Sequence, residues 1–213
     1  MTMRKQPAAG LESAEEAHVR QRILDAAFAA FEENGYATTS TLEIATRARV
    51  SKRELYALVG NKEQMLIACI RARATRLKMP ADLAVPRSRE ELEQILASYG
   101  MQVLREATDP TVVTVFRLAI ADAVRAPEVA RSVDKFGREA SRAALLQIMG
   151  QARSLRLVSG RPADLADRFS GLLWGNLMVG LLLGVTERPK LREISARARY
   201  AAKAFLQIHP PSD

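Results

Sequence analysis

The sequence predicts an all-α protein of about nine helices, and three observations support this fold class. Apolar residues recur at spacings of three and four almost throughout the chain, and no segment alternates strictly between apolar and polar residues. Alanine, leucine, arginine and glutamate, which favour helices, dominate the composition. Several Ser-x-x-Glu patterns mark helix starts, because the two side chains can satisfy each other's free backbone amides. The 213 residues suffice for one or two domains with a substantial core.

The N-terminal part of the chain is predicted to hold a flexible arm and four helices. Residues 1–17 lack apolar periodicity and are expected to form the arm. The first helix follows and ends at Asn34-Gly35, a pair that favours a left-handed helix end. Capped short helices are expected over about residues 41–48 and 52–59, and Asn61 opens a fourth helix that runs to about residue 78.

The rest of the chain, residues 79–213, is predicted to form a C-terminal helical domain. Prolines mark residues 79–87 as the best candidate for a domain boundary. Helices are expected to begin near Ser88, Pro110 and Pro127. Two final helices have regular apolar seams of the kind that packs one helix against another. The seams are Leu165, Phe169, Leu172, Asn176, Val179 and Leu183, and then Leu191, Ile194, Ala198, Ala201, Phe205 and Ile208.

An uncharged run from Phe169 to Thr186 reaches the 18-residue length of a membrane span. Its four glycines and its polar residues favour a helix buried in a protein core instead. No secretory signal pattern opens the chain, so we expect a cytoplasmic protein without a membrane partner.

The composition argues against several function classes. A single cysteine, Cys69, excludes a disulfide framework and a multi-cysteine zinc site. The two histidines, His18 and His209, stand at opposite ends of the chain and are expected to be solvated rather than to bind metal. No nucleophile–base–acid set and no phosphate-binding glycine loop is evident, so neither an enzyme nor a cofactor is expected. A net charge of +8 and a pI near 10.0 are typical of proteins that meet nucleic acid or another anionic surface.

Residues 40–59 contain the most informative pattern, a capped helix, a three-residue turn and a second capped helix. Small or apolar residues stand where two steeply crossing helices would touch: Ala45, Ala48, Val50, Leu55 and Val59. This is the helix-turn-helix pattern, whose second helix fits the DNA major groove. Between residues 34 and 62, five Lys or Arg residues stand against two Glu residues, a local charge of +3.

A series of residues within this region also occurs, in the same order, in a known family. The series is Arg22-Ile23-Leu24-Asp25-Ala26-Ala27, Phe31, Asn34-Gly35-Tyr36, Thr39-Ser40, Ile44-Ala45, Val50-Ser51-Lys52, Leu55-Tyr56, Asn61-Lys62-Glu63 and Leu66. Over about residues 20–67 the chain closely resembles the DNA-binding domain of TetR-type transcriptional regulators. Residues 116–128 resemble the ligand-binding half common in the AcrR branch of that family.

The resemblance implies a helix-turn-helix domain over residues 18–67 and a homodimer that represses transcription from a palindromic operator in double-stranded DNA. It also implies a C-terminal pocket for a small apolar or amphipathic effector. Thr39, Ser40, Tyr56 and Lys62 would contact phosphates, and residues 51–54 would lie in the groove. The predicted DNA-binding residues are Thr39, Ser40, Thr41, Arg49, Ser51, Lys52, Arg53, Glu54, Tyr56 and Lys62.

Two places depart from the family pattern. Arg49 stands where the family usually has glycine, so a left-handed turn there would cost roughly 1 kcal/mol unless its charge near DNA compensates. Arg53 and Glu54 replace a small residue and a Ser or Thr. Arg reads guanine and Glu can accept from cytosine, so the pair suggests an unusual base preference, although Glu54 could instead only complete its helix cap.

Two further sets of C-terminal residues are candidate sites. Each pocket candidate taken alone is more often an ordinary core residue, and Asn176 of the second set could equally be a satisfied polar residue within one chain. The candidates for an effector pocket are Tyr99, Met101, Phe116, Phe136, Met149, Trp174 and Met178. The family's dimerisation through its last two helices makes the seams candidate dimer contacts, namely Leu165, Phe169, Leu172, Asn176, Val179, Leu183, Ile194, Ala198, Ala201 and Phe205.

Two other functions fit the same elements. An all-α small-molecule carrier would bind a ligand but no DNA. An effector-independent architectural protein would bind DNA without sequence preference. Sequence-specific, salt-dependent DNA binding that responds to a ligand would separate the regulator from both alternatives.

Overall fold

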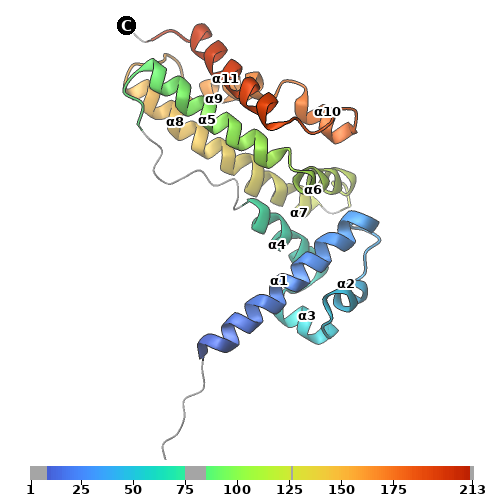
Figure 1. Cartoon of the computed structure of the whole chain (residues 1–213). Helices are drawn as coiled ribbons and strands as arrows, with labels where there is room; N and C mark the ends of the chain where they lie inside the picture. The colour runs from blue at the N-terminus through green and yellow to red at the C-terminus, as the bar shows by residue number, and fades with distance from the viewer. Residues whose placement is uncertain (1–8, 75–84, 126, 212–213) are drawn as a thin grey trace, which may run out of the picture.

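The computed structural model describes residues 9–74, 85–125 and 127–211, and these residues form helices without a β-strand (Figure 1). This confirms the predicted all-α fold. The N-terminal helices are α1 (Ala9–Asn34), α2 (Thr41–Ala48), α3 (Lys52–Leu58) and α4 (Lys62–Ala74). The remaining elements are α5 (Arg89–Ala107), α6 (Pro110–Ala121), α7 (Pro127–Val133), the π-helical segment η2 (Asp134–Glu139), α8 (Ala140–Ser154), α9 (Pro162–Trp174), α10 (Leu177–Leu183) and α11 (Leu191–Ile208).

The predicted helix starts are confirmed by side-chain caps. The hydroxyls of Ser40 and Ser51 each accept a hydrogen bond from the backbone amide three residues later, at 3.1 Å. The reciprocal glutamate bonds are not formed at these two caps within the described residues. A complete reciprocal cap lies at Asn61 and Gln64, where both bonds measure 2.8 Å.

Two helix ends differ from the prediction. Helix α1 already begins at Ala9, so residues 9–17 are helical, and the prediction of an arm is wrong for them. These residues are mostly strong helix formers, and an exposed helix end needs no apolar stripe. At the other end of the unit, α4 is described only to Ala74, so the expected extension to residue 78 lies outside the described residues, as do residues 1–8.

The uncharged run is divided between two helices, which explains part of the difference from the nine expected. Helix α9 ends at Trp174, and the φ of 44° at the next residue, Gly175, breaks the helical path. Arg197 of α11 donates from Nε to the Leu173 carbonyl and from Nη2 to the Trp174 carbonyl, both at 2.7 Å. These bonds replace the amides that a continuous helix would have supplied. None of the helices in the described ranges has both the length and the apolar character that crossing a membrane requires.

The side chains of the described residues form two apolar cores. One core joins α5, α8, α9, α10 and α11. The other lies between α1, α2, α3 and α4, and it also includes Val115, Leu118, Ala119, Val129 and Val133 of α6 and α7. The N-terminal unit therefore packs directly onto the C-terminal half, a relationship that the sequence pattern did not predict.

The expectation that His209 is solvated is wrong. Its side chain is buried, and its ring lies 4.6 Å from the ring of Phe205 between centroids. Burial and the nearby Arg168 lower the pKa of His209, because both disfavour the imidazolium.

Candidate DNA-binding surface and effector cavity

Helices α2 and α3 form the predicted helix-turn-helix, and Arg49 supplies its left-handed turn. Arg49 has φ 53° and ψ 49°, a conformation that glycine adopts more easily. Its backbone amide bonds the Thr46 carbonyl at 3.1 Å. Arg22 of α1 donates to the Ala48 carbonyl at 3.1 Å and so ties the end of α2 to the first helix. These two hydrogen bonds hold the turn, and neither uses the Arg49 side chain, which stays exposed.

The outer side of α3 is exposed at its N-terminal end. Leu55 is fully buried, whereas Ser51, Lys52, Arg53 and Glu54 are exposed. The exposed side of this helix is therefore polar, charged and accessible, as a helix that enters the major groove must be.

Tyr56 lies on the surface and links α3 to the start of α2. Its side chain is 47% exposed, and its hydroxyl lies 3.2 Å from the Thr41 hydroxyl. This position excludes Tyr56 from the core. The two hydroxyls form a pair at the N-terminal end of α2, where the helix dipole favours an anion.

Thr39 does not have the predicted role of a side-chain phosphate donor. The residue is 2% exposed, and its hydroxyl lies 2.7 Å from the Gly35 carbonyl and 3.0 Å from the Ala30 carbonyl. A hydroxyl has one proton to donate, and here it is used within the α1–α2 loop. Thr39 therefore positions the loop that leads into Ser40.

Lys62 is also directed inward, which argues against its predicted phosphate contact. Its ammonium group donates to the carbonyls of Tyr36, Ala37 and Thr39 at 2.9, 3.2 and 3.1 Å. It also lies 4.6 Å from the centroid of the Tyr36 ring. An ammonium has three donors, and all three are occupied. Lys62 thus fastens the α1–α2 loop to the start of α4.

The two acidic residues of the motif have different environments. Glu43 accepts from Asn34 and from Arg47, both at 2.8 Å. The Glu54 carboxylate accepts no hydrogen bond from any described residue and is exposed beside Arg53. The alternative that Glu54 only completes its helix cap is therefore not supported, and its carboxylate is available on the outer side of α3.

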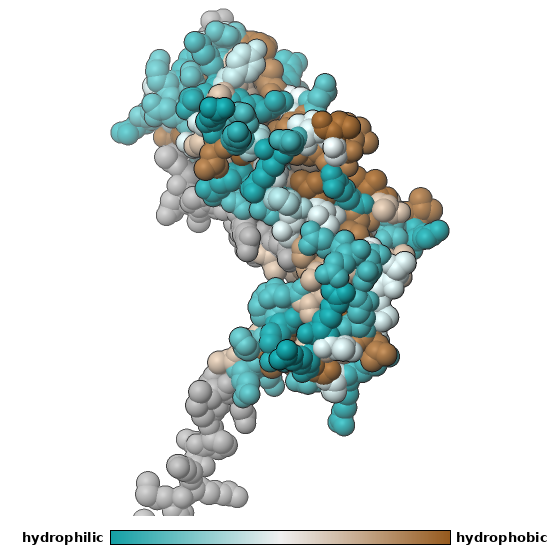
Figure 2. Space-filling model, turned by 45° about the vertical axis from the view of Figure 1, so that its right-hand side comes forward, coloured by the Kyte–Doolittle hydropathy of each residue, from teal (hydrophilic) through white to brown (hydrophobic). Residues whose placement is uncertain are grey.

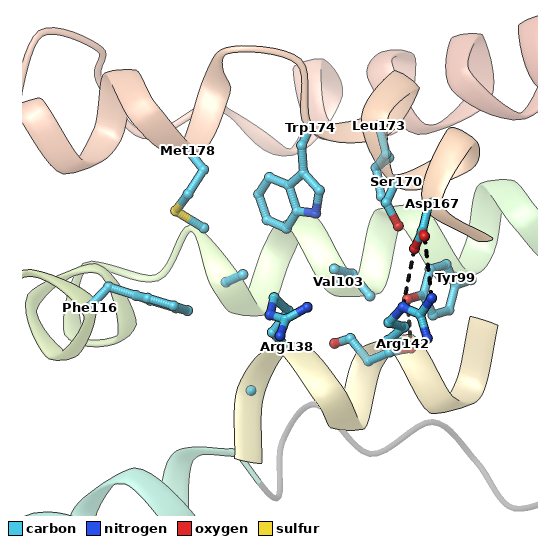
Figure 3. A pocket seen from close by; sticks show the side chains of 13 residues that line it. Tyr99, Val103, Phe116, Arg138, Arg142, Asp167, Ser170, Leu173, Trp174 and Met178 are labelled. Carbon is cyan, nitrogen blue, oxygen red and sulfur yellow. Dashed lines mark hydrogen bonds and ion pairs between the residues drawn. The ribbon is translucent and has the colours of Figure 1, made fainter. Parts of the chain in front are cut away.

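A second candidate site is a cavity of about 310 Å³ in the C-terminal half (Figure 3). It lies between α5, α6, η2, α8, α9 and α10. Four of the seven predicted pocket residues line it: Tyr99, Phe116, Trp174 and Met178. The other lining residues are Val103, Ala107, Gly137, Arg138, Ser141, Arg142, Asp167, Ser170 and Leu173.

Three predicted pocket residues lie elsewhere. Met101 is exposed on the outer side of α5, and Met149 is buried in the core of the C-terminal half. Phe136 belongs to η2 but faces the N-terminal core, and the Arg71 guanidinium of α4 lies over its ring at 4.6 Å. An apolar side chain on these helices can face solvent, one of the two cores or the cavity. The spacing of apolar residues alone does not distinguish these positions.

Sequence reasoning missed the charged side chains of the cavity because it sought only apolar residues. Arg142 binds Asp167 through Nε and Nη2 at 3.1 and 3.3 Å. Arg138 binds Asp134 through Nε and, at 2.9 Å, through Nη2. Asp134 raises the pKa of Arg138, and Arg138 lowers the pKa of Asp134. The available signal was Arg138 and Arg142 at a spacing of four, which places them on one side of a helix.

The hydroxyl of Tyr99 is also fixed in the cavity. It donates to the Ser141 carbonyl at 2.9 Å. Burial raises the pKa of Tyr99 above its usual range, so the side chain stays protonated at neutral pH. Tyr99 therefore adds no negative charge to the cavity.

The predicted dimer seams are largely used within the chain. Six of the ten candidates are 1% exposed or less and cannot contact a partner, so the prediction is wrong for them: Leu165, Phe169, Ile194, Ala198, Ala201 and Phe205. They pack α9 and α11 into the C-terminal core. Leu172 is half-buried, and Asn176, Val179 and Leu183 are exposed.

The family comparisons match both halves of the chain. The family described as "Bacterial regulatory proteins, tetR family" matches residues 23–69. The family described as "AefR-like transcriptional repressor, C-terminal domain" matches residues 94–209, more than half of the chain. The chain belongs to the TetR family. The resemblance of residues 20–67 is thereby confirmed, and the chain is a DNA-binding transcriptional regulator, not an enzyme.

Solved TetR-family structures have the same overall fold. The flavonoid-responsive regulator FrrA is 28% identical, with a TM-score of 0.76 over 92% of this chain and 100% of FrrA. A TetR regulator from Agrobacterium tumefaciens is 25% identical, with a TM-score of 0.74 over 91% of this chain and 95% of that one. A TetR-family regulator from Mesorhizobium loti is 23% identical, with a TM-score of 0.73 over 92% and 98%. No curated protein matches the chain significantly.

Proposed function

We propose that this TetR-family protein is a homodimeric repressor that a small molecule releases from a palindromic operator. The main support is the position of η2, which lines the cavity and contacts α4 of the N-terminal unit. Gly137 and Arg138 line the cavity, while Phe136 contacts Arg71 of α4. A ligand in the cavity therefore lies within one helical turn of a contact to the DNA-binding unit.

Binding to DNA would combine phosphate contacts with base contacts. Lys52, Arg53 and Arg49 supply positive charge on and beside α3, and the Thr41–Tyr56 pair supplies hydroxyls at the start of α2. Phosphate neutralisation makes the logarithm of the binding constant fall linearly with the logarithm of salt concentration. We expect this dependence for all DNA, with Arg53 and Glu54 adding preference for particular bases.

Release would proceed through α6 and η2. Phe116 of α6 lines the cavity, while the neighbouring Val115, Leu118 and Ala119 pack in the core of α1 to α4. Arg117 donates to the carbonyls of Leu181 and Leu182 at the end of α10, at 2.7 and 3.0 Å. A ligand that displaces Phe116 or Arg138 would thus shift α1 and α4. The two recognition helices of a dimer would then lose the spacing of about 34–36 Å that adjacent major grooves demand.

The dimer would form through the exposed apolar residues of α10 and α11. Figure 2 shows hydrophobic surface gathered around α10, whereas the N-terminal unit is mostly hydrophilic. The large exposed apolar residues of α10 and of the chain up to the start of α11 are Val179, Leu183, Val185 and Leu191. Exposed apolar residues gathered in this way are typical of an interaction site, and a two-fold axis would bring the same patch of two copies together. Leu183→Glu should produce a monomer in sedimentation experiments, whereas Leu155→Glu, directly after α8 and outside this patch, should not.

The similarity to FrrA supports an aromatic effector, since that protein is described as flavonoid-responsive. Because a bacterial regulator acts on chromosomal DNA, we place the protein in the cytoplasm.

Selection of bound fragments from a random DNA pool would test the proposal. We expect enrichment of a palindrome and weaker binding of that palindrome when the effector is present. Binding without sequence preference would favour the architectural alternative. Ligand binding without any DNA binding would favour the carrier alternative, and either result would contradict the proposal.

A further inference from the structure

We infer that the cavity takes an aromatic acid, a flat molecule with an ionised oxygen that binds Arg142 while its rings lie against Trp174 and Phe116. The inference rests on the proposed effector role of the cavity and adds the chemical class of the effector. It follows from the aromatic side chains and the two arginines that line the same cavity.

The cavity suits a flat ring system. Phe116 enters it from α6, Trp174 from α9 and Met178 from α10 (Figure 3). Aromatic side chains hold flat rings through stacked and edge-to-face contacts, and methionine adapts to their shape. The volume of about 310 Å³ is at the lower end of the range for small-molecule pockets. A compact ring system fits this space better than a long acyl chain.

The cavity also offers unused hydrogen-bond donors on two guanidinium groups, Arg138 beneath Trp174 and Arg142 beside Asp167 (Figure 3). Arg142 and Arg138 both use Nε and Nη2 for their aspartate partners. Their Nη1 groups donate to no atom in the described ranges. A guanidinium has five N–H donors, so each arginine can bind a further acceptor. The hydroxyls of Ser141 and Ser170 line the same cavity.

Asp167 is the group that a ligand anion would replace. The side chain of Asp167 is 63% exposed, whereas that of Arg142 is 35% exposed. An ion pair exposed to this degree holds weakly, because water competes for both charges. A ligand carboxylate fixed by its rings would make charge-assisted hydrogen bonds to Arg142 at the cavity wall. The released Asp167 carboxylate would remain hydrated at the rim.

Trp174 gives a direct measurement of binding, because it is the only tryptophan in the sequence and lines the cavity. The full-length protein without DNA would be titrated with biphenyl-4-carboxylate, with biphenyl-4-carboxamide and with decanoate. Tryptophan fluorescence would report occupancy, and calorimetry would give affinities. The amide has nearly the shape of the carboxylate but no charge. Decanoate has the charge but no ring.

We expect biphenyl-4-carboxylate to bind about tenfold more tightly than the amide, and more tightly than decanoate. Equal or tighter binding of the amide would overturn the assignment of an anion. Tighter binding of decanoate would overturn the assignment of a ring system. Failure of all three probes to bind would overturn the inference as a whole.

Substitutions of the two residues in the ion pair should change the affinity for the carboxylate in opposite directions. Arg142→Gln should lower affinity for the carboxylate about tenfold and leave affinity for the amide nearly unchanged. Asp167→Asn should raise affinity for the carboxylate, because it removes a competing anion. The control is Arg161→Gln, which removes an ion pair with Asp164 outside the cavity. It should change the affinity for neither the carboxylate nor the amide. A loss of carboxylate binding in both Arg142→Gln and Asp167→Asn would indicate a purely structural ion pair and would contradict the inference.

These measurements can fail separately from the proposed function. Carboxylate binding without any effect on DNA would leave the inference standing and contradict the ligand-released repressor. Operator release by a neutral compound alone would support the repressor and contradict the inference.

Discussion

The guanidinium of Arg71 on α4 lies over the ring of Phe136 in η2, 4.6 Å from the ring centroid. The two residues that follow Phe136, Gly137 and Arg138, line the cavity. Helix α4 begins at Lys62, which holds the loop leading into the helix-turn-helix. The Arg71–Phe136 contact is therefore a short physical connection between the cavity and the DNA-binding unit. The segment η2 is π-helical, and π-helical segments often occur at functional sites.

Replacing Arg71 by glutamine should weaken this connection without removing a core side chain. We expect the operator affinity of Arg71→Gln without effector to stay close to that of the original protein. The effector response, typically about 5–150-fold for coupled sites, should fall several-fold. The measurement is the ratio of operator affinities with and without effector. Arg131→Gln, exposed on α7, is the control, and an unchanged ratio in Arg71→Gln would exclude this connection.

Lys62→Met should act on the fold rather than on phosphate contacts. It leaves three backbone carbonyls without their donor, so the free energy of unfolding should fall by about 1–3 kcal/mol. Operator affinity should fall with an unchanged salt slope. Lys52→Met should instead flatten the salt dependence of operator affinity by about one unit, with little change in the free energy of unfolding. A flattened salt slope in Lys62→Met would show that Lys62 contacts a phosphate and would contradict this prediction.

Arg53→Ala should relax discrimination at one base position by roughly 1–3 kcal/mol, because an arginine on the outer side of α3 can bind guanine through two hydrogen bonds. Affinities for operators that differ at single positions would measure this. Arg47→Gln provides the comparison, since Arg47 is engaged by Glu33 and Glu43 at 2.7 and 2.8 Å. Equal losses on operator and random DNA for Arg53→Ala would assign Arg53 to phosphate.

The helix-turn-helix could be predicted because its signals are local. Serine caps lie three residues from the amides that they bind, and the buried Leu55 stands at a fixed place in the second helix. The inward hydrogen bonds of Thr39 and Lys62 could not be predicted, for the opposite reason. The Lys62 ammonium binds carbonyls 23–26 residues earlier in the chain, and no spacing rule connects such positions.

The cavity and the seams show a second limit of sequence patterns. Helical periodicity identifies side chains that are buried, but it does not say whether they face a core, a cavity or a partner. Phe169 and Phe205 therefore had the pattern of a dimer seam and pack against each other within one chain, 5.7 Å apart between centroids. Arg142 and Asp167 come from separate helices, and only the fold brings them together at the cavity.

Arg49→Gly separates backbone strain from charge in the turn. Glycine adopts positive φ without the clash of a Cβ atom, so the variant should be more stable by about 1 kcal/mol. It should also bind DNA less tightly, because a positive charge beside α3 is lost. Denaturant unfolding and operator affinity at several salt concentrations would measure the two effects. Arg156→Gly is a matched control, since Arg156 also has positive φ, at 58°, but follows α8, far along the chain from the helix-turn-helix. That control should gain stability and keep full DNA affinity. A loss of stability in Arg49→Gly would show that the Arg49 side chain itself holds the turn.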